Sequence, residues 1–416
     1  MQKLAIIGSG ISGIASAYYL RNDYDITIFE KENYLGGHTN TIAVKENGKE
    51  YNIDTGFIVY NEVTYPNLTK LFEELEVETQ ASNMSFSLYN LKTKLQFCGA
   101  GLPGIFAQRS NALRFEYWRF IVQIMRFFKT SVEDLKRSSM DLPLGVYLKK
   151  RRYTKYFVEN YIVPMSSAIW STPMEKMMAF PARTLIEFFR NHGLLGVDTH
   201  HPWRTVKGGS WSYIKNIRAK MPQMKVHNNS PVQSVCRDRN GVVVCTKHEK
   251  YKFDKVLLAT HADQALRMLK DASAKEQNIL GCFKYQKNKA VLHFDESTMP
   301  PLRSIWSAWN YKILPNSPEH TTTTTYYMNR LQNLKTTRNY FVSINEFMPI
   351  DPQKIVYETD YEHPLFCMDA INAQKHLGEL QQNGQVYFAG SYFGYGFHED
   401  GLRAALSASK LLKRKD

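Results

Sequence analysis

Cysteine and long apolar runs are both scarce in this sequence. The five cysteines are scattered and form no CxxC pair, so we expect reduced residues of a cytoplasmic protein that mostly serve packing. No apolar run reaches the ~18 residues that a membrane-spanning helix needs. The first predicted strand begins almost at the N-terminus, so we also expect no signal peptide.

Acidic residues are few relative to basic ones. The chain has 53 Lys and Arg residues against 39 Asp and Glu residues, a formal net charge of +14 at pH 7. Such an excess indicates an anionic partner, which could be nucleic acid, acidic lipid or an acidic substrate. No nucleic-acid-binding motif accompanies the charge, and the basic residues are dispersed. We therefore expect no nucleic-acid partner and favour a membrane surface.

A metal-ligand pattern is missing as well. His200 and His201 follow His192 and Asp198, but no thiol joins them and their spacing fits no standard zinc motif. We therefore expect no metal ion.

The N-terminal thirty residues carry a glycine-rich motif. Gly8, Gly10 and Gly13 follow one short β-branched run and precede a second run that ends at Glu30. Gly8 would allow a tight turn, Gly10 a close approach of the backbone to a pyrophosphate, and Gly13 close packing of helix on strand. The helix N-terminus would add partial positive charge. The pattern predicts a dinucleotide site in which Glu30 binds the adenosine ribose.

The first motif does not separate NAD from FAD, although an acid at position 30 argues against NADP. Three further motifs extend it: residues 36–39 with a Gly-Gly doublet, the turn 54–56, and a closing segment 388–402 that leads from a strand into the last helix. Together these motifs resemble the flavin-containing amine oxidase superfamily, which includes phytoene desaturases and protoporphyrinogen oxidases. The resemblance covers both ends of the chain and implies FAD. The closing loop lacks the cysteine that tethers flavin in some amine oxidases, so non-covalent FAD is expected.

The resemblance implies that FAD contacts every one of these motifs. It places the flavin ring against the turn 54–56 and the adenine beside the backbone at Val232, while helix physics lets the last helix stabilise reduced flavin. Ser391 departs from the family, which often has an acid there. The implied cofactor-binding residues are Gly8, Ser9, Gly10, Ile11, Ser12, Gly13, Glu30, Lys31, Gly36, Gly37, His38, Thr39, Thr55, Gly56, Val232, Gly390, Ser391, Asp400, Gly401 and Leu402.

The predicted fold class is α/β, with two interleaved domains. One is a Rossmann-like FAD-binding domain with a three-stranded β hairpin or meander insert, indicated by the turn Asn240-Gly241. The other is an α+β substrate domain, an antiparallel sheet with helices, whose helical part is 100–195. The run 321–328 is expected to be a strand and 349–364 a loop. The FAD-binding segments are 1–75, 200–270 and 368–416, and the substrate segments are 76–199 and 271–367.

Residues 111–129 predict an unusual helix. At 100° per residue its apolar side chains share a broad face, and most basic ones lie opposite. A basic amphipathic helix with Trp and Phe can lie on an anionic membrane surface; an internal helix of the substrate domain is the favoured alternative. The apolar face is Leu113, Tyr117, Phe120, Ile121, Ile124, Phe127 and Phe128, and the opposite face is Arg119, Gln123, Arg126 and Lys129.

Flavin itself performs redox chemistry, so we expect no catalytic triad. His398, in the closing loop, is a candidate proton shuttle, with a structural role as the alternative. Glu399 is a second candidate beside it, whereas Asp400 could simply cap the helix. Lys289 and His293 are expected on one face of a strand. Amine oxidases often carry a lysine on a comparable strand, hydrogen-bonded through water to flavin N5.

The closing loop, with His293, residues 309–311 and Asn329, most resembles one branch of the superfamily. That branch contains FAD-binding proteins related to the oxidase-like portion fused to plant cyclopropane-fatty-acid synthases, which implies lipid modification. The first hypothesis is hydride transfer between a hydrophobic, fatty-acyl or lipid substrate and flavin N5. The alternatives are an amine oxidase and a flavin-bearing, non-catalytic subunit of a lipid methyltransferase or synthase. A peripheral location on the inner face of a membrane would fit.

Overall fold

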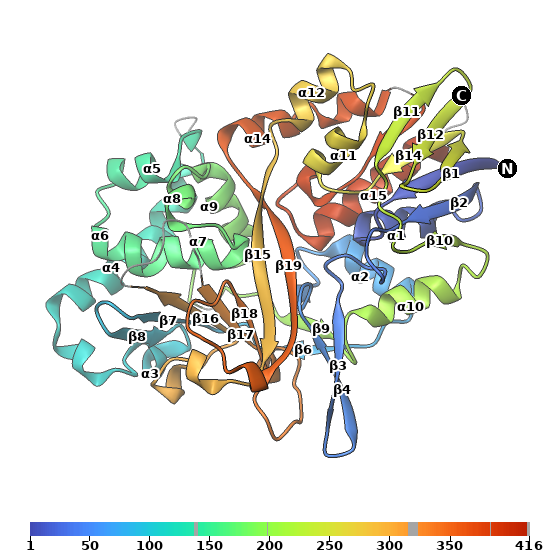
Figure 1. Ribbon diagram of the computed structural model, residues 1–416. Coiled ribbons are helices and arrows are strands. Elements are labelled where there is room, and N and C mark those ends of the chain that lie inside the picture. The colour runs from blue at the N-terminus through green and yellow to red at the C-terminus, as the bar shows by residue number, and fades with distance from the viewer. Residues whose placement is uncertain (137–139, 198, 315–322, 383, 414–416) are drawn as a thin grey trace.

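The computed structural model describes residues 1–136, 140–197, 199–314, 323–382 and 384–413 (Figure 1). Asp198 and the first two residues of the predicted strand 321–328 lie outside these ranges. The chain combines several sheets with helices, which confirms the prediction of a mixed α/β fold. Within the described residues, no helix is long and apolar enough to cross a bilayer, and no cluster of His, Cys, Asp and Glu could hold a metal ion.

A five-stranded parallel sheet forms one half of the molecule, in the order β10-β2-β1-β14-β20. Its central strands are apolar and largely buried, as expected for a parallel sheet covered on both faces. Helices α1 and α15, from the two ends of the chain, pack against each other beside it. The elements are β1 (Gln2–Ile7), β2 (Tyr24–Phe29), β10 (Lys225–His227), β14 (Lys255–Leu258), β20 (Val386–Phe388), α1 (Ile11–Leu20) and α15 (His398–Lys413).

A three-stranded antiparallel sheet accompanies the parallel one, in the order β11-β12-β13. Its first turn is at Gly241, where φ is +147° and a Cβ would lie 2.2 Å from the carbonyl oxygen of Phe253. Only glycine therefore fits this hairpin. The remaining elements of this half are β11 (Ser234–Asp238), β12 (Gly241–Cys245), β13 (Lys250–Phe253), α2 (Pro66–Glu74), α10 (Trp211–Ala219), α11 (Ala262–Met268), α12 (Ala274–Leu280) and α14 (Met368–Gln374).

A seven-stranded sheet forms the other half, in the order β19-β15-β18-β17-β16-β7-β8. Neighbouring strands are antiparallel except for β16 and β7, which are parallel. The strands are β7 (Phe86–Asn90), β8 (Leu95–Cys98), β15 (Lys284–His293), β16 (Trp309–Ile313), β17 (Thr323–Tyr327), β18 (Phe341–Ile344) and β19 (Ile355–Leu365). The prediction of a loop over 349–364 is wrong, because most of it is β19. Figure 1 shows β15 and β19 running between the two halves.

A layer of helices covers one side of the seven-stranded sheet (Figure 1). Their shared core is mostly aromatic and aliphatic. The helices are α3 (Gly101–Ile105), α4 (Phe115–Asp134), α5 (Leu144–Lys150), α6 (Lys155–Phe157), α7 (Val163–Trp170), α8 (Met174–Met178) and α9 (Ala182–Asn191), and α13 (Met328–Leu331) follows β17. Two small sheets join the halves: the hairpin of β3 (Thr41–Glu46) and β4 (Lys49–Asp54), and the group β5 (Tyr60–Asn61), β9 (Trp203–Val206) and β6 (Thr79–Ser82).

Helix α4 replaces the helix predicted over 111–129, and its faces differ from the predicted ones. Leu113 precedes the helix and is exposed, whereas Gln123 is buried. The Gln123 side chain accepts hydrogen bonds from the backbone N–H and the hydroxyl of Thr154. A polar residue is therefore satisfied on the inner face of the helix.

The seven-stranded sheet holds a buried ion pair between Lys312 and Glu346. Their side chains are 1% and 2% exposed, and the Lys312 ammonium also donates to the carbonyl oxygen of Thr298. The Lys289–Glu358 pair of the same sheet is exposed to solvent. Removing one partner of a buried pair leaves an uncompensated charge, whereas an exposed pair contributes little.

We expect Lys312→Met to lower the free energy of unfolding by about 3–5 kcal/mol, because Glu346 would stay buried without a partner. Adding Glu346→Leu to that variant should recover most of the loss. The matched surface variant Lys289→Met should cost less than about 1 kcal/mol. Urea-induced unfolding measures all three, and equal losses in the two lysine variants would contradict the prediction.

Candidate active site

A cavity of about 1290 Å³ extends from the carboxyl end of the parallel sheet into the helical layer. This volume exceeds the roughly 300–1,000 Å³ of ordinary small-molecule sites, so the cavity has room for a dinucleotide and a second molecule. At the sheet end it is lined by residues 7–12, 29–32, 36–38, 230–233 and 390–392.

Three glycines shape the sheet end of the cavity. At Gly8, φ is +95° and a Cβ would lie 2.6 Å from the carbonyl oxygen of Ala259. At Gly13 a Cβ would lie 1.9 Å from the Gly8 carbonyl oxygen, so helix α1 packs directly on the turn. A Cβ on Gly10 would meet nothing within 4 Å. Open space therefore faces the N-terminus of α1, as a bound phosphate would require.

Glu30, at the end of β2, lines the cavity beside this turn. Its carboxylate accepts hydrogen bonds from the Ser9 backbone N–H at 2.9 Å, from the Ser9 hydroxyl at 2.5 Å and from the Glu32 N–H at 3.0 Å. A carboxylate can accept about four hydrogen bonds, so one position remains for a ribose hydroxyl. Lys31 and Val232 also line the cavity.

The Gly36-Gly37 doublet lies over the first turn. Gly37 has a φ of +59°, and its Cβ would be 3.2 Å from the Cα of Gly10. Thr39 lies behind the cavity, where its hydroxyl contacts the Tyr213 hydroxyl at 2.6 Å and the His398 Nε2 at 3.1 Å. The doublet therefore borders the cavity, and Thr39 supports it from behind.

The turn 54–56 is fixed by a buried carboxylate. Asp54 accepts hydrogen bonds from the Ser210 backbone N–H and hydroxyl, and burial raises its pKa to about 6. Thr55 contacts the Tyr361 hydroxyl at 2.7 Å. A Cβ on Gly56 would lie 2.2 Å from the His38 carbonyl oxygen, so Gly56 holds the turn against the His38 loop at the cavity wall.

His38 carries an unsatisfied buried atom. Its ring stacks on Tyr361 with centroids 4.8 Å apart, and among the described residues its Nε2 has no hydrogen-bond partner. Burial, together with nearby histidines, lowers the pKa of His38 well below its usual value, so the ring is neutral. A buried nitrogen that lines a cavity without a partner fits a site for a ligand with polar atoms. The unpartnered His38 Nε2 and the open space at Gly10 together show that these residues fit FAD.

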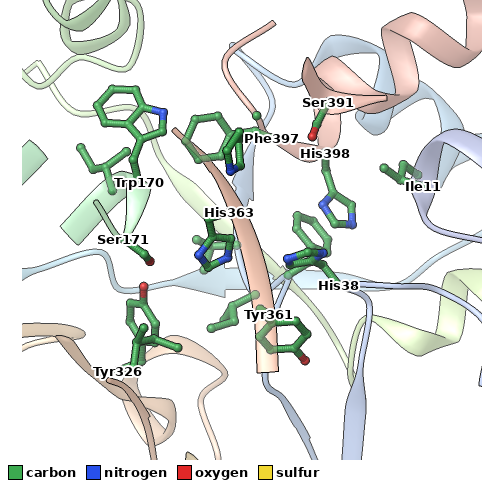
Figure 2. A pocket seen from close by; sticks show the side chains of 18 of the residues that line it. Ile11, His38, Trp170, Ser171, Tyr326, Tyr361, His363, Ser391, Phe397 and His398 are labelled. Atoms are coloured by element: carbon green, nitrogen blue, oxygen red, sulfur yellow. The ribbon is translucent and has the colours of Figure 1, made fainter. Parts of the chain in front are cut away.

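His398, the first residue of α15, lines the cavity and stacks on Phe57 with ring centroids 3.8 Å apart. Burial lowers the pKa of His398 to about 3. A proton shuttle works best with a pKa near the working pH, so the lowered pKa, together with the stacking on Phe57 and the contact of Nε2 with the Thr39 hydroxyl, favours the structural alternative. Gly390 and Ser391 precede it on the same wall, as Figure 2 shows for Ser391 and His398.

Glu399 and Asp400 support the site without lining the cavity. The Glu399 carboxylate accepts hydrogen bonds from the backbone N–H groups of Asn67 at 3.1 Å and Leu68 at 3.0 Å. It therefore caps the N-terminus of α2, and its prediction as a catalytic residue is corrected. Asp400 accepts from the Phe397 N–H at 3.1 Å and from Arg403 at 2.7 Å, and burial raises its pKa to about 6.

Gly401 and Leu402 join the two ends of the chain. A Cβ on Gly401 would lie 2.8 Å from the Ile11 side chain, and the Ser12 hydroxyl donates to the Gly401 carbonyl oxygen at 2.9 Å. Leu402 is fully buried in the core around α1. Neither residue lines the cavity, and α15 begins at His398, three residues before the predicted helix start.

Lys289 and His293 lie away from the cavity, which corrects their prediction as catalytic residues. Lys289 pairs with Glu358 at the surface at 3.0 Å. His293 is fully buried, with its Nε2 2.8 Å from the Ser343 hydroxyl. The two side chains share one face of β15, as predicted, because Lys289 pairs with Glu358 and His293 contacts Ser343, the two residues opposite Val291. The register shift between Leu292 and His293 is an extra residue in β19.

His363 and Tyr361, on β19, line the cavity and were missed from the sequence. The alternating pattern of Tyr357, Thr359, Tyr361 and His363 could have indicated a strand with these side chains on one face. Figure 2 shows His363 between His38 and His398 on one side and Trp170 with Ser171 on the other. It therefore lies where the nucleotide end of the cavity meets the apolar end.

The far end of the cavity is an apolar chamber. Its walls come from β7, β8, α4, α7, α9 and the segment before β9. Among the described lining residues of 84–128 and 161–203, no Asp, Glu, Lys or Arg occurs. The large apolar side chains of this chamber are Met84, Phe86, Phe97, Ile105, Tyr117, Phe120, Ile121, Ile124, Met125, Phe128, Tyr161, Met165, Ile169, Trp170, Phe188 and Trp203.

Comparison with known proteins gives one family match and similar solved structures. The family described as flavin containing amine oxidoreductase matches residues 11–412. A 64-residue segment is 42% identical to protoporphyrinogen oxidase of Dictyostelium discoideum, covering 13% of this chain and 12% of that protein. Wild-type putrescine oxidase bound to putrescine has a TM-score of 0.69 at 13% identity, with 99% of each chain covered. A CLA-producing fatty acid isomerase from P. acnes has a TM-score of 0.65 at 14% identity, with 99% and 98% covered.

We expect Gly10→Ala and Gly13→Ala to separate cofactor binding from folding. A methyl at Gly10 projects into open space, so it should weaken FAD binding about tenfold or more without changing the stability of the flavin-free protein. A methyl at Gly13 meets the Gly8 carbonyl and should lower that stability by about 1–3 kcal/mol. Flavin titration and urea unfolding of the flavin-free protein measure the two effects. Wild-type FAD affinity in Gly10→Ala would contradict the placement of the pyrophosphate.

Proposed function

The chain belongs to the family of flavin-containing amine oxidoreductases and is an FAD-dependent oxidoreductase, and from this premise we propose that it transfers a hydride between a fatty-acyl or similar lipid chain and flavin N5. One observation carries the proposal: a single cavity joins the dinucleotide-shaped end to a chamber whose described lining residues within 84–128 and 161–203 include no charged Asp, Glu, Lys or Arg. A hydrocarbon chain gains free energy by leaving water for such walls. A cationic amine would lose hydration there without an acid to replace it.

The chain's own residues would bind and orient FAD without a covalent bond. The turn at Gly8 and the N-terminus of α1 would hold the pyrophosphate, Glu30 the ribose, and the backbone near Val232 the adenine. When bound, FAD would supply hydride acceptance or delivery at N5. Residues 36–38, the turn 54–56 and residues 390–391 would hold the ring at the chamber's entrance.

The chamber would position the substrate and exclude water. Residues from α4 and α7 would grip the acyl chain along its length, which places one C–H bond near the reacting end. The fold is shared with a fatty acid isomerase, which supports room for an acyl chain in this architecture. A lipid methyltransferase or synthase as partner, and a location on the inner, cytoplasmic face of a membrane, belong to the same proposal.

Amine oxidation is the second candidate. Putrescine oxidase has the same fold, and the aromatic rings of Trp170 and Phe397, with centroids 6.2 Å apart, face the same part of the cavity (Figure 2). Aromatic faces can hold a cation or a neutral amine. Asp360 and Glu362 line the cavity on β19, but no acid occurs among the described lining residues of 84–128 and 161–203, so the chamber itself fits a lipid better than a cation.

We expect phospholipid or free fatty acid either to bleach oxidised bound flavin or to reoxidise flavin that was reduced beforehand, as seen in anaerobic spectra. Amines should leave the flavin spectrum unchanged. Ile169→Trp, which fills the chamber, should slow the lipid-dependent change about tenfold or more but leave dithionite reduction intact. The exposed Val146 does not line the cavity, and Val146→Trp is the control. Peroxide released with amines would establish the second candidate, and a flavin that neither class changes would favour a non-catalytic subunit.

A further inference from the structure

Helix α4 has a second apolar stripe that faces solvent. Phe115, Trp118, Val122 and Met125 follow one another at spacings of three, four and three residues, which places them on one side of the helix. Phe115 is 83% exposed and Val122 63%. Leu102 and Leu113, on the adjoining segments, are exposed as well. These six residues are the α4 patch below.

The α4 patch is flanked almost entirely by positive charge. Arg109, Arg114, Arg119, Arg126 and Lys129 are exposed within 101–129, and Glu116 is the only acid of that range. Large apolar side chains among arginines match an anionic lipid surface, where the apolar groups enter the headgroup boundary and the cations meet phosphates. Exposed apolar groups of this size otherwise favour association.

The cavity reaches the surface at the same place. Met125 belongs to the α4 patch, is half exposed and also lines the chamber. Ala100, Gly101 and Ile121 line the chamber nearby in the sequence. The inner face of α4 therefore walls the chamber while its outer face presents the patch.

We propose that the α4 patch docks the protein on an anionic bilayer, so that acyl chains enter the chamber between α3 and α4 directly from the membrane. The docking rests on the patch, and only the entry of substrate rests on the proposed function. Vesicle binding is measured without turnover, so the docking can fail while lipid still bleaches the flavin, and flavin bleaching can fail while the protein still binds vesicles.

Sedimentation with vesicles of equal parts phosphatidylglycerol and phosphatidylcholine tests the docking. The FAD-loaded protein should bind these vesicles and release them at high salt, and Phe115→Ser/Val122→Ser should bind about tenfold or more weakly, since each buried large apolar side chain contributes about that factor. Phe347→Ser/Val63→Ser removes the same residue types, also exposed, from other surfaces and should bind like the wild type. Arg114→Gln/Arg119→Gln should weaken binding to the anionic vesicles alone.

Equal binding by the two double serine variants, or no binding by the wild type, would overturn the docking. A concentration-dependent dimer that Phe115→Ser/Val122→Ser abolishes would also overturn it, since a second copy of the chain would then cover the patch. Flavin absorbance and circular dichroism confirm that each variant is folded.

A different observation concerns the orientation of His363. The Lys289 backbone N–H donates to the Asn345 Oδ1 at 2.9 Å, so the Asn345 Nδ2 faces the Asn288 Oδ1 at 2.7 Å. The Asn288 Nδ2 therefore faces the His363 Nδ1 at 2.9 Å, and it also donates to a carbonyl at Gln286. A backbone N–H can only donate, so each amide in this series has one orientation.

The series makes the His363 Nδ1 an acceptor. A neutral ring then carries its proton on Nε2, and burial lowers the pKa of His363 to about 4, which keeps the ring neutral. His363 lines the cavity beside His38, with ring centroids 5.4 Å apart. We infer that His363 donates its Nε2–H to bound flavin, and that Asn288 and Asn345 are positioning residues that fix this tautomer.

The midpoint potential of the bound flavin and ¹⁵N spectra of the histidines test this role. His363→Phe should weaken the preference for reduced over oxidised FAD about tenfold, a shift of about −30 mV, and His363→Gln, which keeps an N–H donor, should restore part of it. Asn288→Asp should move the His363 proton to Nδ1. The surface variant His376→Phe is the control. A wild-type Nδ1–H tautomer, or an unchanged potential in His363→Phe, would overturn the assignment.

Discussion

The packing of α1 against α15 is the constraint on which the rest of the structure depends. The first helix after the glycine turn and the last helix of the chain approach so closely that Gly401 has no room for a side chain, and Ser12 donates a hydrogen bond across their contact. Pairing of β20 with β14 fixes the same relation within the sheet. The segment 390–398 is thereby held beside the turn 8–12, and both segments contribute to the cavity wall.

The nucleotide end was predictable because its geometry is local. Gly8, Gly10 and Gly13 lie in a turn and a helix that directly follow one another, so their spacing in the sequence was enough to predict their roles. Gly241 likewise marks a hairpin whose strands adjoin it. The closing segment lies far away in sequence, and only the resemblance to a known superfamily linked it to the first turn.

The reacting end was less predictable because distant segments define it. A loop was predicted over 349–364, yet pairing with β15 makes a long strand there and brings His363 to the cavity. Asn288 and Asn345, which orient that ring, lie 75 and 18 positions from it. Period-two alternation placed Lys289 and His293 on one face of β15, but it could not show that this face lies away from the cavity. Helical periodicity alone could not show that Gln123 is buried and that Thr154 supplies its hydrogen bonds.

The union of both chain ends also sets an order on biosynthesis. Translation produces the glycine turn well before Gly401, so a nascent polypeptide has the phosphate turn long before it has the wall that closes over it. The middle, with its apolar chamber, emerges in between and must stay collapsed without its cofactor. Until Gly401 has been made, the apolar residues of the chamber lack the segment that completes the nucleotide end, and transiently exposed apolar surface of this kind favours aggregation.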